Sequence, residues 1–145
     1  MIDGLDTTLL VELELCESPG HEAARRFLER RVLSGEETLA LAPQVIGEFI
    51  HVVTDPRRFA SPLPMDEAIR RSDFWWQARE VRRVHPSSES VDRALRLMER
   101  HHLGRKRILD TLLAATYLCA GIHRIVTTNA RDYSTFEEIT PVIPR

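Results

Sequence analysis

The hydrophobic positions of this chain alternate between short continuous runs and helical patterns. Short apolar runs are typical of strands buried in a parallel sheet, and apolar residues that recur every three or four positions are typical of helices packed on it. Strands are expected at residues 2–6, 38–42, 81–85, 124–127 and 139–142, and helices at residues 9–15, 21–34, 44–54, 65–80 and 87–101. This alternation predicts one α/β domain over residues 1–145, with a mostly parallel central sheet of about five short strands and helices on both faces.

The segment 108–120 differs from the other predicted helices because it is apolar almost all round, which is typical of a core helix. Gly121 follows it and suits a C′ position, where glycine adopts the left-handed conformation without steric cost. Asp110 lies in its opening turn. An aspartate there either caps the helix and complements its dipole or takes part in chemistry, and the segment alone leaves both interpretations open.

Four acidic residues lie where a site would form in such a sheet. Asp6 ends the first predicted strand, and Glu48 lies on the helix that follows the second. Asp110 opens the helix before the fourth strand, and Asp132 lies in the loop after it. Because sites in open parallel sheets form at the carboxyl ends of the strands, we expect these four carboxylates to converge on one edge of the sheet.

Such a convergence of acids indicates a metal site. Like charges raise each other's pKa, so several ionised carboxylates need a cation between them. An oxygen-only ligand set suits Mg²⁺ or Mn²⁺. One or two of these ions can align a water for in-line attack on a phosphodiester and stabilise the leaving oxygen. The pattern therefore favours a phosphodiester hydrolase, with hydroxyl or amide groups that orient water and a basic rim.

Composition limits the other possibilities. The charge of -2 argues against a general electrostatic coat for nucleic acid, although an acidic site can offset basic flanks. No apolar run approaches the roughly 20 residues of a membrane span, and the opening Met1-Ile2-Asp3 lacks a basic signal-peptide region. Cys16 and Cys119 lie far apart and are expected to be reduced and buried, as in a cytoplasmic protein.

Taken together, these features resemble the PIN-domain ribonucleases, in particular the VapC-type toxins of bacterial toxin–antitoxin pairs. The resemblance covers essentially the whole chain. Four stretches carry it in the family's order and spacing, namely residues 2–8 with the leucine-rich helix after them, 43–48, 110–115 and 125–133. It implies a three-layer sandwich and a Mg²⁺- or Mn²⁺-dependent endoribonuclease.

The resemblance also assigns roles residue by residue. Asp6, Glu48 and Asp110 match the three main metal-site acids. Many members have an aspartate where this chain has Asn129, so the fourth position belongs either to Asn129 or to Asp132. The supporting, water-orienting groups would be Thr127, Asn129 and Thr8, the last standing where the family often has Asn or Ser.

Basic residues flank these acids and are candidates for phosphate contacts, although a solvated loop explains them equally. They are Arg105, Lys106, Arg107 and Arg131. The other acids have simpler interpretations, because Asp3 lies near the start of a strand, and Glu12 and Glu14 suit a solvated helix face. His101 and His102 lack further ligands at zinc spacing.

Two other functions are considered. A phosphotransfer receiver-like domain also gathers acids around Mg²⁺, but it needs a lysine late in the chain, and the single lysine, Lys106, precedes the core helix. A PIN-like module that binds RNA or protein without catalysis would have lost one of its first three acids, and none is lost here.

The resemblance implies two protein partners, a small antitoxin and a second copy of the chain in a homodimer. The antitoxin would occupy a groove walled by the helices at 21–34, 44–54 and 65–80. Trp75 and Trp76 are adjacent on the last of these helices and so point to different sides. One of them is expected in the core. For the other, stacking on a base and contact in the partner groove are both open, and we favour the groove.

Overall fold

The computed structural model describes all residues from Met1 to Arg145 and contains one sheet of five parallel strands. The strand order is β3-β2-β1-β4-β5, so β1 lies at the centre. Neighbouring strands are hydrogen-bonded, and in their register Gly4 lies opposite Ala40 on β2 and opposite Ile125 on β4. The strands are β1 (Ile2–Leu5), β2 (Thr38–Leu41), β3 (Val81–Arg83), β4 (Arg124–Val126) and β5 (Thr140–Val142).

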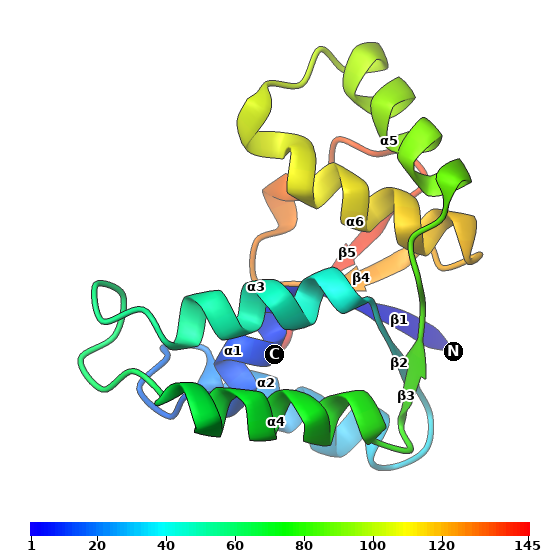
Figure 1. Ribbon diagram of the computed structural model, residues 1–145. Helices are drawn as coiled ribbons and strands as arrows, with labels where there is room; N and C mark the ends of the chain where they lie inside the picture. Colours follow the sequence, from blue (N-terminus) through cyan, green and yellow to red (C-terminus); the bar gives the residue numbers. More distant parts are fainter.

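Six α-helices cover the two faces of this sheet (Figure 1). The chain moves from β1 outward to β2 and β3, and then returns past β1 to β4, so the two sets of right-handed crossovers lie on opposite faces. The helices α1 to α4 belong to the first set, and α5 and α6, which pack on each other, to the second. They are α1 (Thr7–Glu14), α2 (His21–Phe27), α3 (Pro43–Val53), α4 (Met65–Gln77), α5 (Ser88–Arg100) and α6 (Ile108–Cys119).

This topology places a crevice beside β1. The chain reverses its direction across the sheet between β1 and β4, and ligands bind at the carboxyl ends of strands at such a switch point. Asp6 directly follows β1, and Thr127 directly follows β4. The predicted α/β sandwich is confirmed, and every strand pair is parallel.

The core helix α6 lies directly over the centre of the sheet. Tyr117 is fully buried, and its hydroxyl donates to the backbone oxygens of Leu5 (2.6 Å) and Ala40 (3.1 Å), at the ends of two neighbouring strands. Its ring covers Gly4, where an added Cβ would lie 2.6 Å from Tyr117 Cδ2. A side chain at position 4 would therefore separate the helix from the sheet.

The end of α6 is also as predicted. Gly121 has a φ of 75°, and its N–H donates to Leu118 O at 3.0 Å, while Ile122 N donates to Tyr117 O at 2.9 Å. These two bonds form a Schellman motif, which directs the chain into β4.

At the amino end of the strands, a buried ionic cluster ties β1 to β4. Arg124 Nε lies 3.0 Å from Asp3 Oδ1, and Arg124 Nη2 lies 3.4 Å from Glu37 Oε1. Arg31 also pairs with Glu37. Burial, followed by the neighbouring Glu37 carboxyl, raises the pKa of Asp3 to about 7. Asp3 is thus part of the framework, far along β1 from Asp6.

The boundaries of several elements differ from the prediction. The first helix begins at Thr7 and not at residue 9, because Asp6 leaves the strand and caps the helix at once, accepting from Thr7 N at 2.9 Å. The predicted helix over residues 21–34 is α-helical only to Phe27 and continues as a π-helical turn over Leu28–Val32. The helix α4 and the strand β3 end three and two residues earlier than expected, at Gln77 and Arg83.

Three predictions about individual side chains are wrong. Cys16 is exposed and Cys119 partly exposed, so neither is buried, although both are free thiols. Glu14 contacts other side chains and is not simply solvated. Its carboxylate accepts a hydrogen bond from Trp75 Nε1 at 2.6 Å and forms an ion pair with Arg71. Glu12 accepts from Gly20 N at 2.8 Å and closes the turn between α1 and α2. None of the helices has the length and apolar character that crossing a membrane requires.

The contact between α6 and the sheet predicts the effect of a single added methyl group. Gly4→Ala places a Cβ against the buried Tyr117 ring and should lower the free energy of unfolding by about 1 to 3 kcal/mol. Urea unfolding followed by circular dichroism measures the change. The control is Gly47→Ala on α3, where an added Cβ meets nothing within 4 Å and should stabilise the helix by about 0.5 to 1 kcal/mol. Equal stability of the Gly4→Ala variant and the wild type would contradict the close approach.

Candidate active site

Asp6 lies at the centre of the site and accepts four hydrogen bonds. Its Oδ1 accepts from Thr7 N (2.9 Å) and from the Tyr133 hydroxyl (2.9 Å). Its Oδ2 accepts from the Thr127 hydroxyl (2.7 Å) and the Thr8 hydroxyl (3.1 Å). The donors come from both ends of the chain, so the carboxylate joins the start of α1 to the loop after β4.

The environment of Asp6 acts on its charge in two directions. Burial raises the pKa of Asp6, and the hydrogen bonds from Thr127, Tyr133, Thr8 and Thr7 oppose that rise because they favour the ionised form. Burial is the larger effect.

Glu48 approaches Asp6 from α3. It lies in the second turn of this helix, and its Oε2 accepts from the Thr7 hydroxyl at 3.2 Å. Thr7 therefore donates its backbone N–H to one acid and its side-chain hydroxyl to the other. Burial of the carboxyl group, and then repulsion from Asp6, raises the pKa of Glu48.

Asp110 lies in the first turn of α6, two residues after the helix begins, and no side-chain hydrogen bond caps this helix. Asp110 makes no capping hydrogen bond, and it is Asp6 that caps a helix, but as an acid in the first turn Asp110 does complement the dipole of α6. Burial raises the pKa of Asp110 to about 7, and the charges of Asp132, Asp6 and Glu48 add to the effect. Because the charges of three other acids act on Asp110, its carboxyl group lies in the same site as theirs.

The two candidates for the fourth position, Asn129 and Asp132, lie side by side. Asn129 Nδ2 donates to Asp132 Oδ2 at 2.5 Å; Asn129 directly precedes the short 3-10 turn Ala130–Asp132, and Asp132 is its last residue. Asp132 is also the first of the charges that raise the pKa of Asp110. Asp132 thus brings a negative charge close to Asp110, and the Asn129 amide holds its carboxylate.

The residues present fit a divalent cation in their chemistry. All the candidate ligands are carboxylate oxygens, and the raised pKa values of Glu48 and Asp110 arise in part from mutual repulsion that a cation would neutralise. In this structure no three such side chains are drawn together closely enough to hold an ion. The acids therefore have the composition of a hard-cation site, and binding requires their side chains to move toward one another.

The acids lie between two hollows in the surface. One, of about 550 Å³, lies between α3, α5 and α6 and is mainly apolar, with Glu48 and Asp110 in its wall. The other, of about 450 Å³, is lined by Thr7, Thr8 and Arg58 and also reaches Glu48. Glu48 borders both, so the two hollows meet at this acid.

Only part of the predicted basic rim is available for phosphate contacts, because Arg107 binds within the protein. Arg107 donates to the backbone oxygen of Asp132 and so holds the 3-10 turn next to the site. Arg105, Lys106 and Arg131 are exposed.

Three residues at the site were missed in the sequence. Tyr133 follows Asp132, and its aromatic character alone did not reveal the hydroxyl contact with Asp6. Thr7 reads as an ordinary first residue of a helix, and Arg58 lies in a loop with no periodic pattern. Only the fold, which brings residues 7, 58 and 133 to one place, identifies them.

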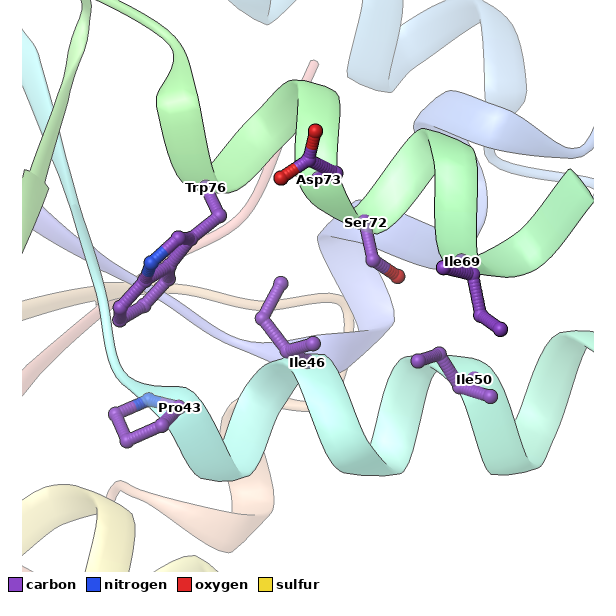
Figure 2. A pocket seen from close by; sticks show the side chains of 7 residues that line it. All are labelled: Pro43, Ile46, Ile50, Ile69, Ser72, Asp73 and Trp76. Carbon is purple, nitrogen blue, oxygen red and sulfur yellow. The ribbon is translucent and has the colours of Figure 1, made fainter. Parts of the chain in front are cut away.

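A separate apolar groove of about 310 Å³ lies between α3 and α4. Figure 2 shows Ile46 and Ile50 on α3 facing Ile69 and Trp76 on α4. Trp75, the residue before Trp76, is buried. As predicted, one tryptophan belongs to the core and the other lines a groove.

Solved structures with the same fold include a toxin from Mycobacterium tuberculosis and a toxin–antitoxin complex from Klebsiella pneumoniae. VapC20 of Mycobacterium tuberculosis, a toxin that cleaves the sarcin–ricin loop, is 19% identical over 86% of this chain and 87% of its own, with a TM-score of 0.66. VapBC2 of Rickettsia felis, solved with a DNA fragment of its promoter, is 17% identical over 99% of this chain and 98% of the matched one (TM-score 0.68). FitAcB of Neisseria gonorrhoeae is 15% identical over 99% and 98% (TM-score 0.69).

At sequence identities of 15% to 19%, these structures establish only the fold, and the chemistry has to be argued from the residues of this chain. No curated protein sequence matches the chain. The sequence model of the PIN domain, however, matches residues 5–139, which include all four acids and Tyr133. This chain belongs to the PIN domain family.

Proposed function

We propose that this protein is a metal-dependent endoribonuclease and the toxin of a type II toxin–antitoxin pair. The observation that carries the proposal is the arrangement of the acids, in which Thr7 links Asp6 to Glu48 by its backbone and side chain and the charges of Asp132, Asp6 and Glu48 act on Asp110. Membership of a nuclease family and structural likeness to VapC toxins support it. A non-catalytic module would have no need of this arrangement, and the family match leaves no support for a receiver-like domain.

Asp6, Glu48, Asp110 and Asp132 would hold Mg²⁺ or Mn²⁺. When bound, such an ion lowers the pKa of a coordinated water and neutralises charge on the phosphodiester. Asp6 is fixed by buried donors, whereas Glu48 and Asp110 approach from separate helices. Thr127 orients Asp6, Asn129 orients Asp132, and Thr8 lies next to Asp6 with its hydroxyl partly exposed, in position to orient a water.

The substrate would be single-stranded or looped RNA that crosses the acids between the two hollows. Single strands suit such a path, because their backbone can lie in a groove while the bases remain free to turn outward. Arg58 lines one hollow, and Arg105, Lys106 and Arg131 are exposed for phosphate contacts. RNA as substrate and an antitoxin as partner imply a cytoplasmic location.

The antitoxin would lay an apolar helix or tail in the groove between α3 and α4. Large apolar side chains facing each other across two helices suit a helix-in-groove contact. The neighbours from Rickettsia felis, Klebsiella pneumoniae and Neisseria gonorrhoeae are toxin–antitoxin assemblies, which supports a partner of this kind. The homodimer expected from the family resemblance stays a prediction.

The first prediction concerns catalysis. Cleavage of a fluorescent single-stranded RNA should require Mn²⁺ or Mg²⁺ and stop with EDTA. Asp110→Asn keeps the shape but removes a ligand charge, so it should lower the rate by more than the roughly 10- to 100-fold that follows loss of an outer-shell partner. The control is Asp92→Asn, an exposed aspartate on α5, which should cleave like the wild type. Undiminished cleavage by Asp110→Asn at saturating metal would refute the role.

A second prediction concerns stability and pH. Because burial and repulsion raise the pKa of Asp110 from 3.8 to about 7, its ionised form destabilises the folded state above pH 7. Without metal, Asp110→Asn should therefore melt at a higher temperature than the wild type at pH 8. The difference in melting temperature should shrink as the pH falls from 7 toward 3.8, because the folded protein binds a proton at Asp110 in this range while the unfolded chain does not. Thermal melts in EDTA at several pH values test this, and a difference that grows on acidification would contradict it.

A third prediction concerns the partner. Trp76→Ala removes the indole from the groove between α3 and α4 and should weaken the antitoxin complex by about 2 kcal/mol or more, as loss of an aromatic anchor does. Phe74→Ala is the matched control, since Phe74 is an aromatic on the same helix that is 68% exposed and outside this groove. Titration calorimetry with the antitoxin measures both. Equal affinities of the two variants would rule out the groove and leave the nuclease proposal intact.

A further inference from the structure

The hydrogen bonds of Asp6 leave this carboxylate no free acceptor site. An ionised carboxylate offers about four lone-pair positions. Two donors occupy each oxygen, Thr7 N and Tyr133 on Oδ1 and Thr127 and Thr8 on Oδ2. A cation that binds Asp6 directly must therefore replace one donor.

The four donors differ in how easily they can leave. Thr7 N belongs to the first turn of α1, and the Tyr133 and Thr127 side chains are fully buried. The Tyr133 hydroxyl has no acceptor other than Asp6 Oδ1, so turning it away would leave a buried donor unsatisfied, which is costly. Thr8 is the only donor whose side chain is partly exposed.

Thr8 also has a second acceptor within reach. Its Oγ1 lies 3.3 Å from Thr127 Oγ1, and the Thr127 hydroxyl already donates its one hydrogen to Asp6. With both hydrogens on Asp6, neither hydroxyl donates to the other. The Thr8 hydrogen makes the longer bond to Asp6 (3.1 Å, against 2.7 Å for Thr127), so it is the one that turns more easily toward the other hydroxyl. Rotation of the Thr8 hydroxyl hydrogen from Asp6 Oδ2 to Thr127 Oγ1 frees one lone pair of Asp6 and leaves no group unsatisfied.

We infer that Asp6 takes up its cation by exchange, in which Tyr133 keeps Oδ1 fixed while the Thr8 hydroxyl releases Oδ2. Tyr133 is thus a positioning residue, acting through Asp6 without touching the ion or the substrate. While no cation is bound, the Thr8 hydroxyl occupies the acceptor position on Asp6 Oδ2 that the cation would take. This inference rests on the proposed metal dependence and adds the order in which the donors of one ligand are released.

The test measures Mn²⁺ affinity by titration calorimetry on the full chain after removal of metal with EDTA. Tyr133→Phe removes only the hydroxyl and should weaken Mn²⁺ binding by about 10- to 100-fold, as the loss of an outer-shell partner does. Tyr117→Phe is the matched control. It removes the hydroxyl of the other fully buried tyrosine, which binds backbone oxygens and not Asp6, and it should bind Mn²⁺ like the wild type.

Thr8→Val provides an independent second variant. It removes the donor that competes for Asp6 Oδ2, and the exposed Thr128 N–H that Thr8 accepts from can turn to water. Its Mn²⁺ affinity should be no weaker than that of the wild type. The inference is overturned if Tyr133→Phe binds Mn²⁺ as tightly as Tyr117→Phe, or if Thr8→Val loses affinity to the same degree as Tyr133→Phe. Absence of Mn²⁺ binding by the wild type would overturn the metal dependence itself, together with the inference.

Discussion

Repulsion between four carboxylates is the constraint on which the site depends. It is tolerated because the fold supplies hydrogen-bond donors separately to three of the four acids. Asp6 receives four donors, Glu48 receives the Thr7 hydroxyl, and Asp132 receives the Asn129 amide. Asp110 receives none of comparable kind, and its pKa rises accordingly. The least compensated acid, Asp110, lies on the core helix α6, seven of whose residues are buried, and the packing of this helix must offset the free-energy cost of that charge.

The packing of α6 makes that cost sustainable. Its buried face, from Thr111 to Leu118, lies on the centre of the sheet, and the contact between Tyr117 and Gly4 leaves no space for adjustment. At its far end the Schellman motif at Gly121 turns the chain directly into β4. The helix therefore fixes two site segments at once, Asp110 at its start and Thr127 beyond its end.

The sequence was sufficient for the order of strands and helices, since period-two and period-3.6 patterns depend only on burial. It also placed Asp6, Glu48, Asp110 and Asp132 near one edge of the sheet, because residues that follow parallel strands share that edge. The hydroxyl contacts of Thr7 and Tyr133 could not be predicted, because they depend on side-chain directions between residues 127 positions apart in one case and 41 in the other. The predictions for Cys16 and Glu14 were wrong for a similar reason. A helical pattern indicates which residues share a face of the helix, but it does not indicate which other elements pack against that face.

The central position of β1 has a consequence for synthesis of the protein. The first strand pairs with β4, and Asp6 is held by Thr127 and Tyr133, so the site contains residues from the beginning and the end of the chain. A nascent chain that has reached only α5 lacks Asp110, β4 and both buried donors to Asp6. Such non-local contacts also delay folding, since a long loop must close before they form. Incomplete chains released from the ribosome before about residue 133 therefore lack Tyr133, one of the buried donors to Asp6, and carry no assembled site.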